Sequence, residues 1–190
     1  KKNDRTKVEP ITEMKDIALI KKVLADSLRD LCLFTLGINT NLRASDLLRI
    51  TVGQVRNKQP GDELELKEKK TGKVRRITLN GAVIASIRSF LASKEYGDHE
   101  PLFVSQRGAK ALTVQSVNRL VKSWCREINL KGNYGSHTLR KTFGYMQRTQ
   151  RKTGIPELMA LFKHSSQRQT MDYLCIQPEE LKDAYMELEL

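Results

Sequence analysis

Apolar residues recur at helical spacing over most of the chain and predict a series of amphipathic helices. Thr12 is a suitable N-cap for the first helix, and Thr113 is a suitable N-cap for a later one. Residues 28–38 are apolar around most of a helix circumference, which is typical of a buried helix. Helical patterns run over residues 12–24, 28–38, 81–93 and 113–128. In the last of them the apolar stripe expected to face inward is Val114, Val117, Val121, Trp124 and Ile128.

Residues 63–79 follow a different pattern and predict a β-hairpin. Leu64 and Leu66 alternate with charged residues on the first strand. Ile77 and Leu79 share one face of the return strand, after a Thr-Gly turn. Helices with one hairpin predict a mainly α (α+β) fold, in which a compact helical domain carries a small antiparallel sheet. At 190 residues the chain can bury one sizeable core.

The charge distribution favours a polyanionic partner. The sequence has 34 Lys and Arg against 22 Asp and Glu, a formal net charge of +12. Most of the excess lies between Ser105 and Lys152, where the acidic residue Glu127 stands among many basic ones. After Tyr173 the balance reverses, and Lys182 stands among acidic residues. An acidic tail would be repelled by DNA, but it would be attracted to a basic protein surface.

The cysteines and the hydropathy of the sequence indicate the cellular compartment of the protein. Cys32, Cys125 and Cys175 are far apart and form no Cys-x-x-Cys pair, so we expect reduced, buried thiols in a cytoplasmic protein. The sequence shows no signal peptide and no long apolar run, so we expect neither secretion nor membrane insertion. The chain begins with two lysines, and we expect it to be a fragment of a longer protein.

The last third of the sequence carries the candidate chemistry. His137 and Arg140 are three residues apart and share one face of a predicted helix. An imidazole that exchanges protons near neutral pH and a permanently charged guanidinium could together grip a phosphate. On one unbroken helix His164 and Tyr173 would lie about 13 Å apart, so we expect the chain to turn between them. The two serines after His164 are suitable N-caps for a helix that brings Tyr173 back.

In this order the residues resemble the C-terminal signature of the tyrosine recombinases, the phage integrase family. That signature is His-x-x-Arg, then His-Ser-Ser, then a Tyr nine residues after the second His. Upstream, Arg43 followed by Asp46 resembles the family's first arginine box, and Lys70 in Lys-Thr-Gly resembles its hairpin lysine. The match covers essentially the whole chain. The sequence departs from the family at Lys141, where His is frequent, and at Lys163, where Gly is frequent.

The resemblance implies a site-specific DNA recombinase, or integrase, that cleaves and rejoins strands through a 3′-phosphotyrosine without metal, ATP or another cofactor. With the polar start and the acidic, amphipathic end of the sequence, we expect a linker remnant over residues 1–10, a catalytic domain over 11–177 and an acidic tail helix over 178–190. The partner would be double-stranded DNA at specific recombination sites. A homo-oligomer, a tetramer, would assemble on that DNA, and the fragment alone would be monomeric in solution. We expect it in the cytoplasm of a bacterium, encoded by that host or by a phage.

The resemblance also implies a role for each candidate residue. In the family the arginines bind the scissile phosphate, the carboxylate after the first arginine orients the site, and the tyrosine is the nucleophile. The first histidine accepts the tyrosine proton, the lysine protonates the leaving 5′ oxygen, and the second histidine hydrogen-bonds the phosphate. The catalytic set is Arg43, Lys70, His137, Arg140, His164 and Tyr173, supported by Asp46. Basic residues expected to position DNA through its phosphates are Arg119, Lys122, Arg126 and Lys141.

Other interpretations remain open. Arg43 and Asp46 alone could form a surface ion pair that contributes little, and a charged hairpin tip is usually only solvated. A type IB topoisomerase would have a similar active site, whereas a non-catalytic DNA-binding module would use the basic block without forming an adduct. A metal-dependent nuclease is disfavoured, since no cluster of carboxylates with His stands out in the sequence. The acidic tail could complete its own domain or dock on a neighbouring copy.

Overall fold

The computed structural model describes residues 7–70, 72–105, 110–174 and 186 of the chain. The chain divides into two compact units, Lys1–Phe143 and Gly144–Leu190. Helix α7 (Ser136–Thr149) begins in the first unit and ends in the second. Within the described ranges, no helix has both the length and the apolar character needed to cross a bilayer.

The first unit combines helices with one antiparallel hairpin. Its elements before α7 are α1 (Met14–Val23), α2 (Leu28–Asn39), α3 (Ala44–Leu47), α4 (Val52–Val55), β1 (Glu63–Lys67), β2 (Val74–Thr78), α5 (Gly81–Leu91) and α6 (Val114–Glu127). The second unit contains the end of α7, then α8 (Ile155–Phe162) and α9 (Gln167–Leu174). The mainly helical fold with a small antiparallel sheet is therefore confirmed.

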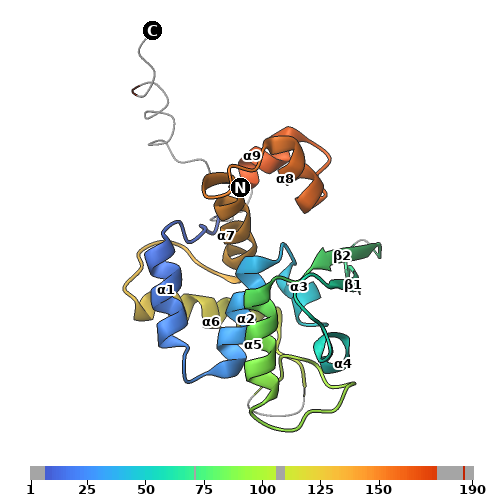
Figure 1. The fold of residues 1–190 in the computed structure, drawn as a ribbon. Coiled ribbons are helices and arrows are strands. Elements are labelled where there is room, and N and C mark those ends of the chain that lie inside the picture. Colours follow the sequence, from blue (N-terminus) through green and yellow to red (C-terminus); the bar gives the residue numbers. More distant parts are fainter. Residues whose placement is uncertain (1–6, 71, 106–109, 175–185, 187–190) are drawn as a thin grey trace, which may run out of the picture. The chain divides into compact units, whose positions relative to one another are not determined.

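The core of the first unit forms around α2. Leu33, Phe34 and Leu36 on this helix are each 0% exposed, as the all-round apolar pattern predicts. Burial of each such side chain stabilises the fold by about 1.5–3 kcal/mol. Figure 1 shows α5 lying alongside α2. The Phe34 ring meets Trp124 of α6 edge to face, with 5.9 Å between ring centroids. Helix α2 is thus the element against which the other helices of this unit are placed.

A glycine in α2 allows the start of α7 to approach closely. A Cβ atom added to Gly37 would lie 2.5 Å from Leu139 Cδ1 and 2.9 Å from Leu139 Cβ. Leu139 is only 3% exposed and occupies the space that a side chain at position 37 would need. Since His137 and Arg140 lie on the same helix as Leu139, Gly37 helps to fix the position of the His-x-x-Arg motif.

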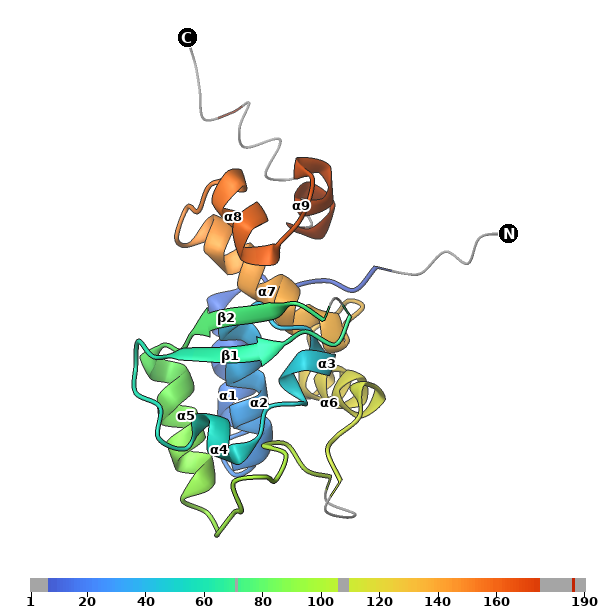
Figure 2. The same cartoon turned by 90° about the vertical axis from the view of Figure 1, so that its right-hand side faces the viewer.

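The hairpin forms as the alternating pattern predicts, and Figure 2 shows its two strands side by side. Leu64 pairs with Ile77 and Leu66 pairs with Arg75 across the strands. Gly72 in the turn has φ of 68°, a conformation that glycine adopts without steric cost.

Helix α1 begins later than the sequence predicts. Thr12 is not its N-cap, because the helix starts at Met14 and Glu13 occupies the cap position without a side-chain hydrogen bond. The reason is the backbone of Glu13, which is extended with φ of −102° and ψ of 132°, so the helix cannot begin before Met14. The segment before the helix is held against α7, since the backbone N–H of Ile11 donates to Thr142 Oγ1 at 2.9 Å.

Helix α6 confirms its predicted cap but not its whole apolar stripe. Thr113 Oγ1 accepts a hydrogen bond from the Ser116 N–H at 3.1 Å. Val114, predicted to face inward, is 40% exposed because the first turn of α6 extends beyond the core. Val117 and Trp124 are buried as predicted, and so is Val121. Cys175 and the predicted tail helix over residues 178–190 lie outside the described residues, apart from Met186.

The second unit folds around its own small apolar centre. Ser166 caps α9, since its Oγ accepts a hydrogen bond from the Gln169 N–H at 3.3 Å, as predicted. A Cβ added to Gly144 of α7 would lie 2.8 Å from Phe162 Cζ and 3.3 Å from Leu174 Cδ2. The absence of a side chain at Gly144 therefore lets α8 and α9 pack closely on this part of α7.

Candidate active site

The first arginine box lies at the start of α3. Arg43 is the N-cap residue of this helix, and its backbone is extended with φ of −70° and ψ of 149°. Its Nη1 atom is 3.9 Å from Asp46 Oδ2 and 3.4 Å from Glu68 Oε2. Asp46 is only 2% exposed, so this is not the solvated surface ion pair of the alternative interpretation. The Arg43 side chain keeps 27% exposure, which allows the guanidinium to meet a ligand from solvent.

Asp46 also ties the hairpin to the arginine box. Its Oδ1 atom accepts a hydrogen bond from the backbone N–H of Lys69 at 2.8 Å. Lys70, the next residue along the chain, is exposed on the hairpin. One buried carboxylate therefore contacts Arg43 with one oxygen and positions the segment carrying Lys70 with the other.

A buried ion pair on the hairpin was missed by sequence reasoning. Glu68 Oε1 accepts a hydrogen bond from Arg75 Nη1 at 2.9 Å, and the two residues are 4% and 3% exposed. The alternation of apolar and polar residues along the two strands indicates this pair. Glu68 is in phase with the buried Leu64 and Leu66, and Arg75 is in phase with Leu79. A period of two residues thus places both charges on the buried face. Loss of either partner alone would cost about 3–5 kcal/mol, because it leaves the other charge buried.

Three cations act electrostatically on the imidazole of His137 at the start of α7. Partial desolvation by neighbouring atoms lowers the pKa of His137, although the residue still reaches solvent. The positive charges of Arg140, Lys141 and Arg43 lower this pKa further. Arg43 is almost a hundred positions away in sequence, so the fold has brought both arginines close to one histidine. At neutral pH His137 is therefore uncharged and able to accept a proton.

The other basic candidates fall into two classes of exposure. Arg119, Lys122 and Arg126 are exposed on α6, as predicted. Lys141 is only 7% exposed, so it offers much less surface for direct contact with DNA than these three residues do. Its charge nevertheless contributes to the positive field at His137.

Three aromatic rings assemble in the second unit. The ring centroids of His164 and Tyr173 are 5.4 Å apart at an interplanar angle of 71°. Phe162 contacts both rings, at 5.3 Å from His164 and 5.0 Å from Tyr173. His164 Nδ1 and Thr170 Oγ1 are hydrogen-bonded at 3.0 Å, and Thr170 is fully buried. The predicted turn between His164 and Tyr173 therefore forms and brings their rings into contact.

Lys163 supplies that turn in a conformation that glycine usually adopts. It follows α8 with φ of 54° and ψ of 43°, in the left-handed region. The Lys163 N–H donates to Ala160 O at 3.1 Å and the His164 N–H donates to Met159 O at 3.0 Å. These two bonds form the Schellman closure of a helix C-terminus. Lys163 thus forms the closure that glycine usually supplies, and the chain turns toward His164.

The candidate residues consequently form two groups, each assembled inside its own unit. The first unit holds Arg43, Asp46, Lys70, His137 and Arg140. The second unit holds His164 and Tyr173.

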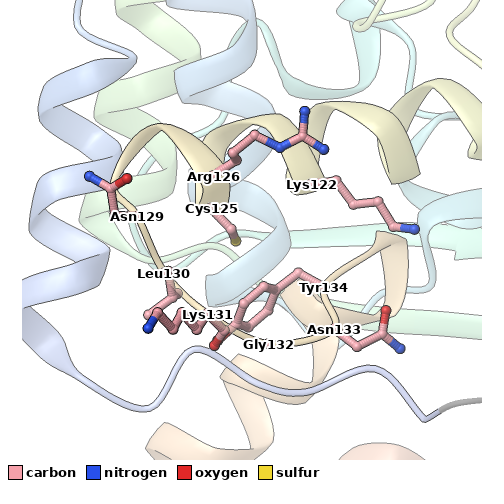
Figure 3. A pocket seen from close by; sticks show the side chains of 9 residues that line it. All are labelled: Lys122, Cys125, Arg126, Asn129, Leu130, Lys131, Gly132, Asn133 and Tyr134. Carbon is pink, nitrogen blue, oxygen red and sulfur yellow. The ribbon is translucent and has the colours of Figure 1, made fainter.

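A separate basic groove of about 560 Å³ lies at the C-terminal end of α6. Figure 3 shows Lys122 and Arg126 on the helix, and Asn133 and Tyr134 on the loop that faces it. Burial, followed by the charge of Glu9 and other acidic groups, raises the pKa of Tyr134 to about 12, so its hydroxyl stays protonated. The residues that line the groove are Lys122, Cys125, Arg126, Asn129, Leu130, Lys131, Gly132, Asn133 and Tyr134. Cations and amides can bind phosphate oxygens, whereas the Tyr134 hydroxyl already donates to Lys131 O at 3.0 Å.

The cysteines within the described part of the chain are buried and reduced. Burial raises the pKa of both Cys32 and Cys125 to about 12, which makes these thiols poor nucleophiles. Among the described residues, no three or more His, Cys, Asp or Glu side chains form a group that could hold a metal ion.

Comparisons with known proteins identify the family and the fold. Residues 11–180 match the family described as "Phage integrase family". The chain is 36% identical over 179 residues to the "Probable integrase/recombinase YoeC" of Bacillus subtilis (strain 168), covering 94% of this chain and 95% of that protein. It is 31% identical to "Tyrosine recombinase XerC" of Caldanaerobacter subterraneus subsp. tengcongensis, over 82% of this chain and 44% of XerC. The chain thus spans nearly all of the first relative but less than half of the second.

Solved structures share the fold. The crystal structure of XerA recombinase superposes with a TM-score of 0.76 at 17% identity, covering 94% of this chain and 65% of XerA. The XerH recombinase bound to palindromic difH substrate in a post-cleavage complex gives a TM-score of 0.75 at 18% identity, covering 97% of this chain and 54% of XerH. The family match, the two relatives and these folds agree, and the chain belongs to the phage integrase family of tyrosine recombinases.

Proposed function

We propose that this site-specific DNA recombinase cleaves DNA with Tyr173 and binds the scissile phosphate with Arg43 and Arg140. The observation that supports it most is the arginine box, where the buried Asp46 contacts Arg43 and accepts the backbone N–H of Lys69, next to Lys70. The positive charges of Arg43 and Arg140 at His137 are consistent with it. Two fixed guanidinium groups can neutralise the non-bridging oxygens of a phosphodiester, and this is the main requirement of phosphoryl transfer.

In the proposed reaction the Tyr173 oxygen attacks phosphorus while the bond from phosphorus to the 5′ oxygen breaks. The Tyr173 proton passes to His137, whose lowered pKa leaves it uncharged and ready to accept. Lys70 protonates the departing 5′ oxygen from its exposed place on the hairpin. The products are a 3′-phosphotyrosine and a free 5′ hydroxyl, and attack by a 5′ hydroxyl on the adduct rejoins the strands. The arginine clamp makes a metal or another cofactor unnecessary for these steps.

His164 and its neighbours support the nucleophile in this proposal. Thr170 holds one ring nitrogen of His164, and we assign the other nitrogen to a hydrogen bond with the phosphate. Contacts of the Tyr173 ring with His164 and Phe162 restrict its orientation, which lowers the entropic cost of an in-line attack.

Double-stranded DNA would be held mainly through its phosphates. Arg119, Lys122 and Arg126 are exposed on one helix, and two of them line the basic groove. Such contacts position DNA without reading its sequence. Lys141 is mostly buried, so we assign it first to the electrostatic field of the active site. We keep the DNA contact predicted for it as a second role.

The assembly and location of the protein are part of the same proposal. We expect the 190-residue chain to be monomeric in solution and to form a tetramer on paired recombination sites, with the acidic segment 178–190 docking on a neighbouring copy. Sedimentation of the protein with and without DNA, before and after deletion of that segment, measures this directly. The bacterial relatives and the reduced thiols favour the cytoplasm of a bacterium, with the gene carried by the host or by a phage.

The decisive test of function is covalent adduct formation on nicked suicide substrates, measured on a denaturing gel. Tyr173→Phe should abolish the adduct while leaving DNA binding intact, because only the nucleophilic oxygen is removed. Tyr145→Phe is the matched control and should form adduct normally. Adduct that persists in Tyr173→Phe would assign the nucleophile to another residue. The relatives are named as integrase or recombinase, which favours strand exchange over the plasmid relaxation of a topoisomerase.

A further inference from the structure

We propose that Glu68 and Arg75 act as a positioning pair that orients Arg43 toward the scissile phosphate. The inference rests on the proposed role of Arg43 and extends it to two hairpin residues. Neither residue would touch DNA. Both would act through the guanidinium of Arg43.

The geometry divides the two oxygens of Glu68 between two arginines. Oε1 is 2.9 Å from Arg75 Nη1, and Oε2 is 3.4 Å from Arg43 Nη1. Glu68 and Arg75 are both almost completely buried, whereas Arg43 keeps 27% exposure. A carboxylate fixed by a buried partner keeps its position and can anchor a partly exposed side chain such as Arg43. Glu68 therefore defines where one edge of the Arg43 guanidinium lies, and the planar fork then sets the direction of its other donors.

The charge balance explains why Arg75 is needed. Arg43 faces two carboxylates, Asp46 and Glu68, at the same nitrogen atom. Those three groups alone would carry one net negative charge, which would repel a phosphate. Arg75 adds the second positive charge, so the four groups sum to zero. Arg43 can then be held by two anions while the nearby cations of α7 keep the site attractive to a phosphate.

The same contacts connect the arginine clamp to the proposed general acid. Glu68 and Lys69 are consecutive, and the Lys69 N–H donates to Asp46 at 2.8 Å. Both carboxylates around Arg43 are therefore joined to the segment that carries Lys70. The positioning pair thus fixes Arg43 with respect to that segment.

The test compares single-turnover adduct formation by the full chain and by Glu68→Gln on two suicide substrates. One has an ordinary scissile phosphate. The other has a methylphosphonate there, which lacks one charged oxygen and so demands less from Arg43. Glu68→Gln should slow cleavage of the ordinary substrate by on the order of tenfold or more, the effect expected when a group that orients a ligand is lost. Cleavage of the neutral substrate should slow much less.

Two variants keep the test interpretable. Glu65→Gln removes a carboxylate from an exposed ion pair with Arg76 on the same hairpin, so it should leave both rates unchanged. If Glu68→Gln fails to fold, as judged by its melting curve, the double variant Glu68→Met/Arg75→Met replaces the buried pair with apolar side chains of similar size. It should show the same difference between the two substrates.

Three results would overturn the inference. Equal slowing on both substrates would mean that the pair only stabilises the fold, and an unchanged rate would mean that it has no role. Full rescue of Glu68→Gln by a 5′-bridging sulfur, whose departure needs no proton, would show that the pair acts through Lys70 instead of Arg43. The absence of any adduct with the unsubstituted chain is a different outcome, because it would overturn the proposed function itself.

Discussion

At the residue scale, the positive field at the start of α7 controls the protonation of His137. Desolvation and the charges of Arg140, Lys141 and Arg43 all disfavour the imidazolium, so the pKa lies below its ordinary value. The unfolded chain lacks these contacts. Between the lowered pKa and the ordinary value near ~6.5, the unfolded state therefore binds more protons than the folded state does. It follows that the free energy of unfolding decreases as the pH falls through this window.

An NMR titration of the histidines measures this effect. We expect His137 to titrate below the ordinary range, and Lys141→Met to move its pKa upward, because one neighbouring positive charge is removed. Lys94→Met is a suitable control, since that ammonium lies over the Tyr96 ring at 4.6 Å and does not contribute to the field. A titration of His137 at or above ~6.5 in the unsubstituted chain would contradict the electrostatic account of the site.

The conformation of Lys163 gives a second prediction at this scale. A side chain in the left-handed region costs roughly 1 kcal/mol relative to glycine, and Lys163 has φ of 54° there. Lys163→Gly should therefore raise the free energy of unfolding by about 0.5–1 kcal/mol, although added freedom of the unfolded chain offsets part of the gain. Chemical denaturation measures the change. Lys163→Ala should give no such gain, because alanine retains the Cβ atom.

At the scale of elements, sequence periodicity predicts what local patterning determines and misses what tertiary contacts determine. The hairpin follows its period of two residues, and α2 is buried on most sides, as its nearly continuous apolar run predicts. Thr12 is wrong as the predicted cap of α1, because the sequence does not show that the backbone of Glu13 is extended. The buried pair of Glu68 and Arg75 was visible in the alternation, but charged residues at inward positions are easily assigned to solvent. The site residues came from motif order, whereas their contacts required the fold.

The close approach of α2 and α7 gives a prediction for these elements. Gly37→Ala would place a Cβ atom 2.5 Å from Leu139 Cδ1, so α7 must shift. We expect a loss of about 1–3 kcal/mol of stability, together with slower adduct formation, because the His-x-x-Arg motif moves with the helix. Gly81→Ala at the start of α5 is the control, since no atom lies within 4 Å of its added Cβ. Equal stability of the two variants in thermal melts would show that the contact between α2 and α7 can relax.

At the scale of the whole molecule, the net charge of +12 makes affinity for DNA depend on salt. Each phosphate neutralised by a basic side chain releases condensed counterions. The logarithm of the binding constant therefore falls by about 0.9 for each tenfold rise in salt and each contact. The groove beside α6 supplies Lys122 and Arg126 for such contacts.

This dependence can be measured by titrating DNA at several salt concentrations. The double variant Lys122→Gln/Arg126→Gln should make the slope of the logarithm of the binding constant against the logarithm of salt shallower by the amount of about two phosphate contacts. It should weaken binding equally for all DNA sequences, because phosphates carry no sequence information. Lys15→Gln/Lys22→Gln on α1 keeps the same net charge as this variant and should change the slope less. An equal change in both variants would mean that only total charge matters.

The hydrogen bond from the Lys69 backbone to Asp46 has a consequence for mutational tolerance. Position 69 contributes its peptide N–H to the site, and its side chain is exposed. A saturation scan should find nineteen residue types acceptable there, because all of them carry that N–H. Proline, which lacks the N–H, should be the exception. A position that tolerates almost every side chain would usually be dismissed as neutral surface, yet here its invariant atom joins the hairpin to the arginine box.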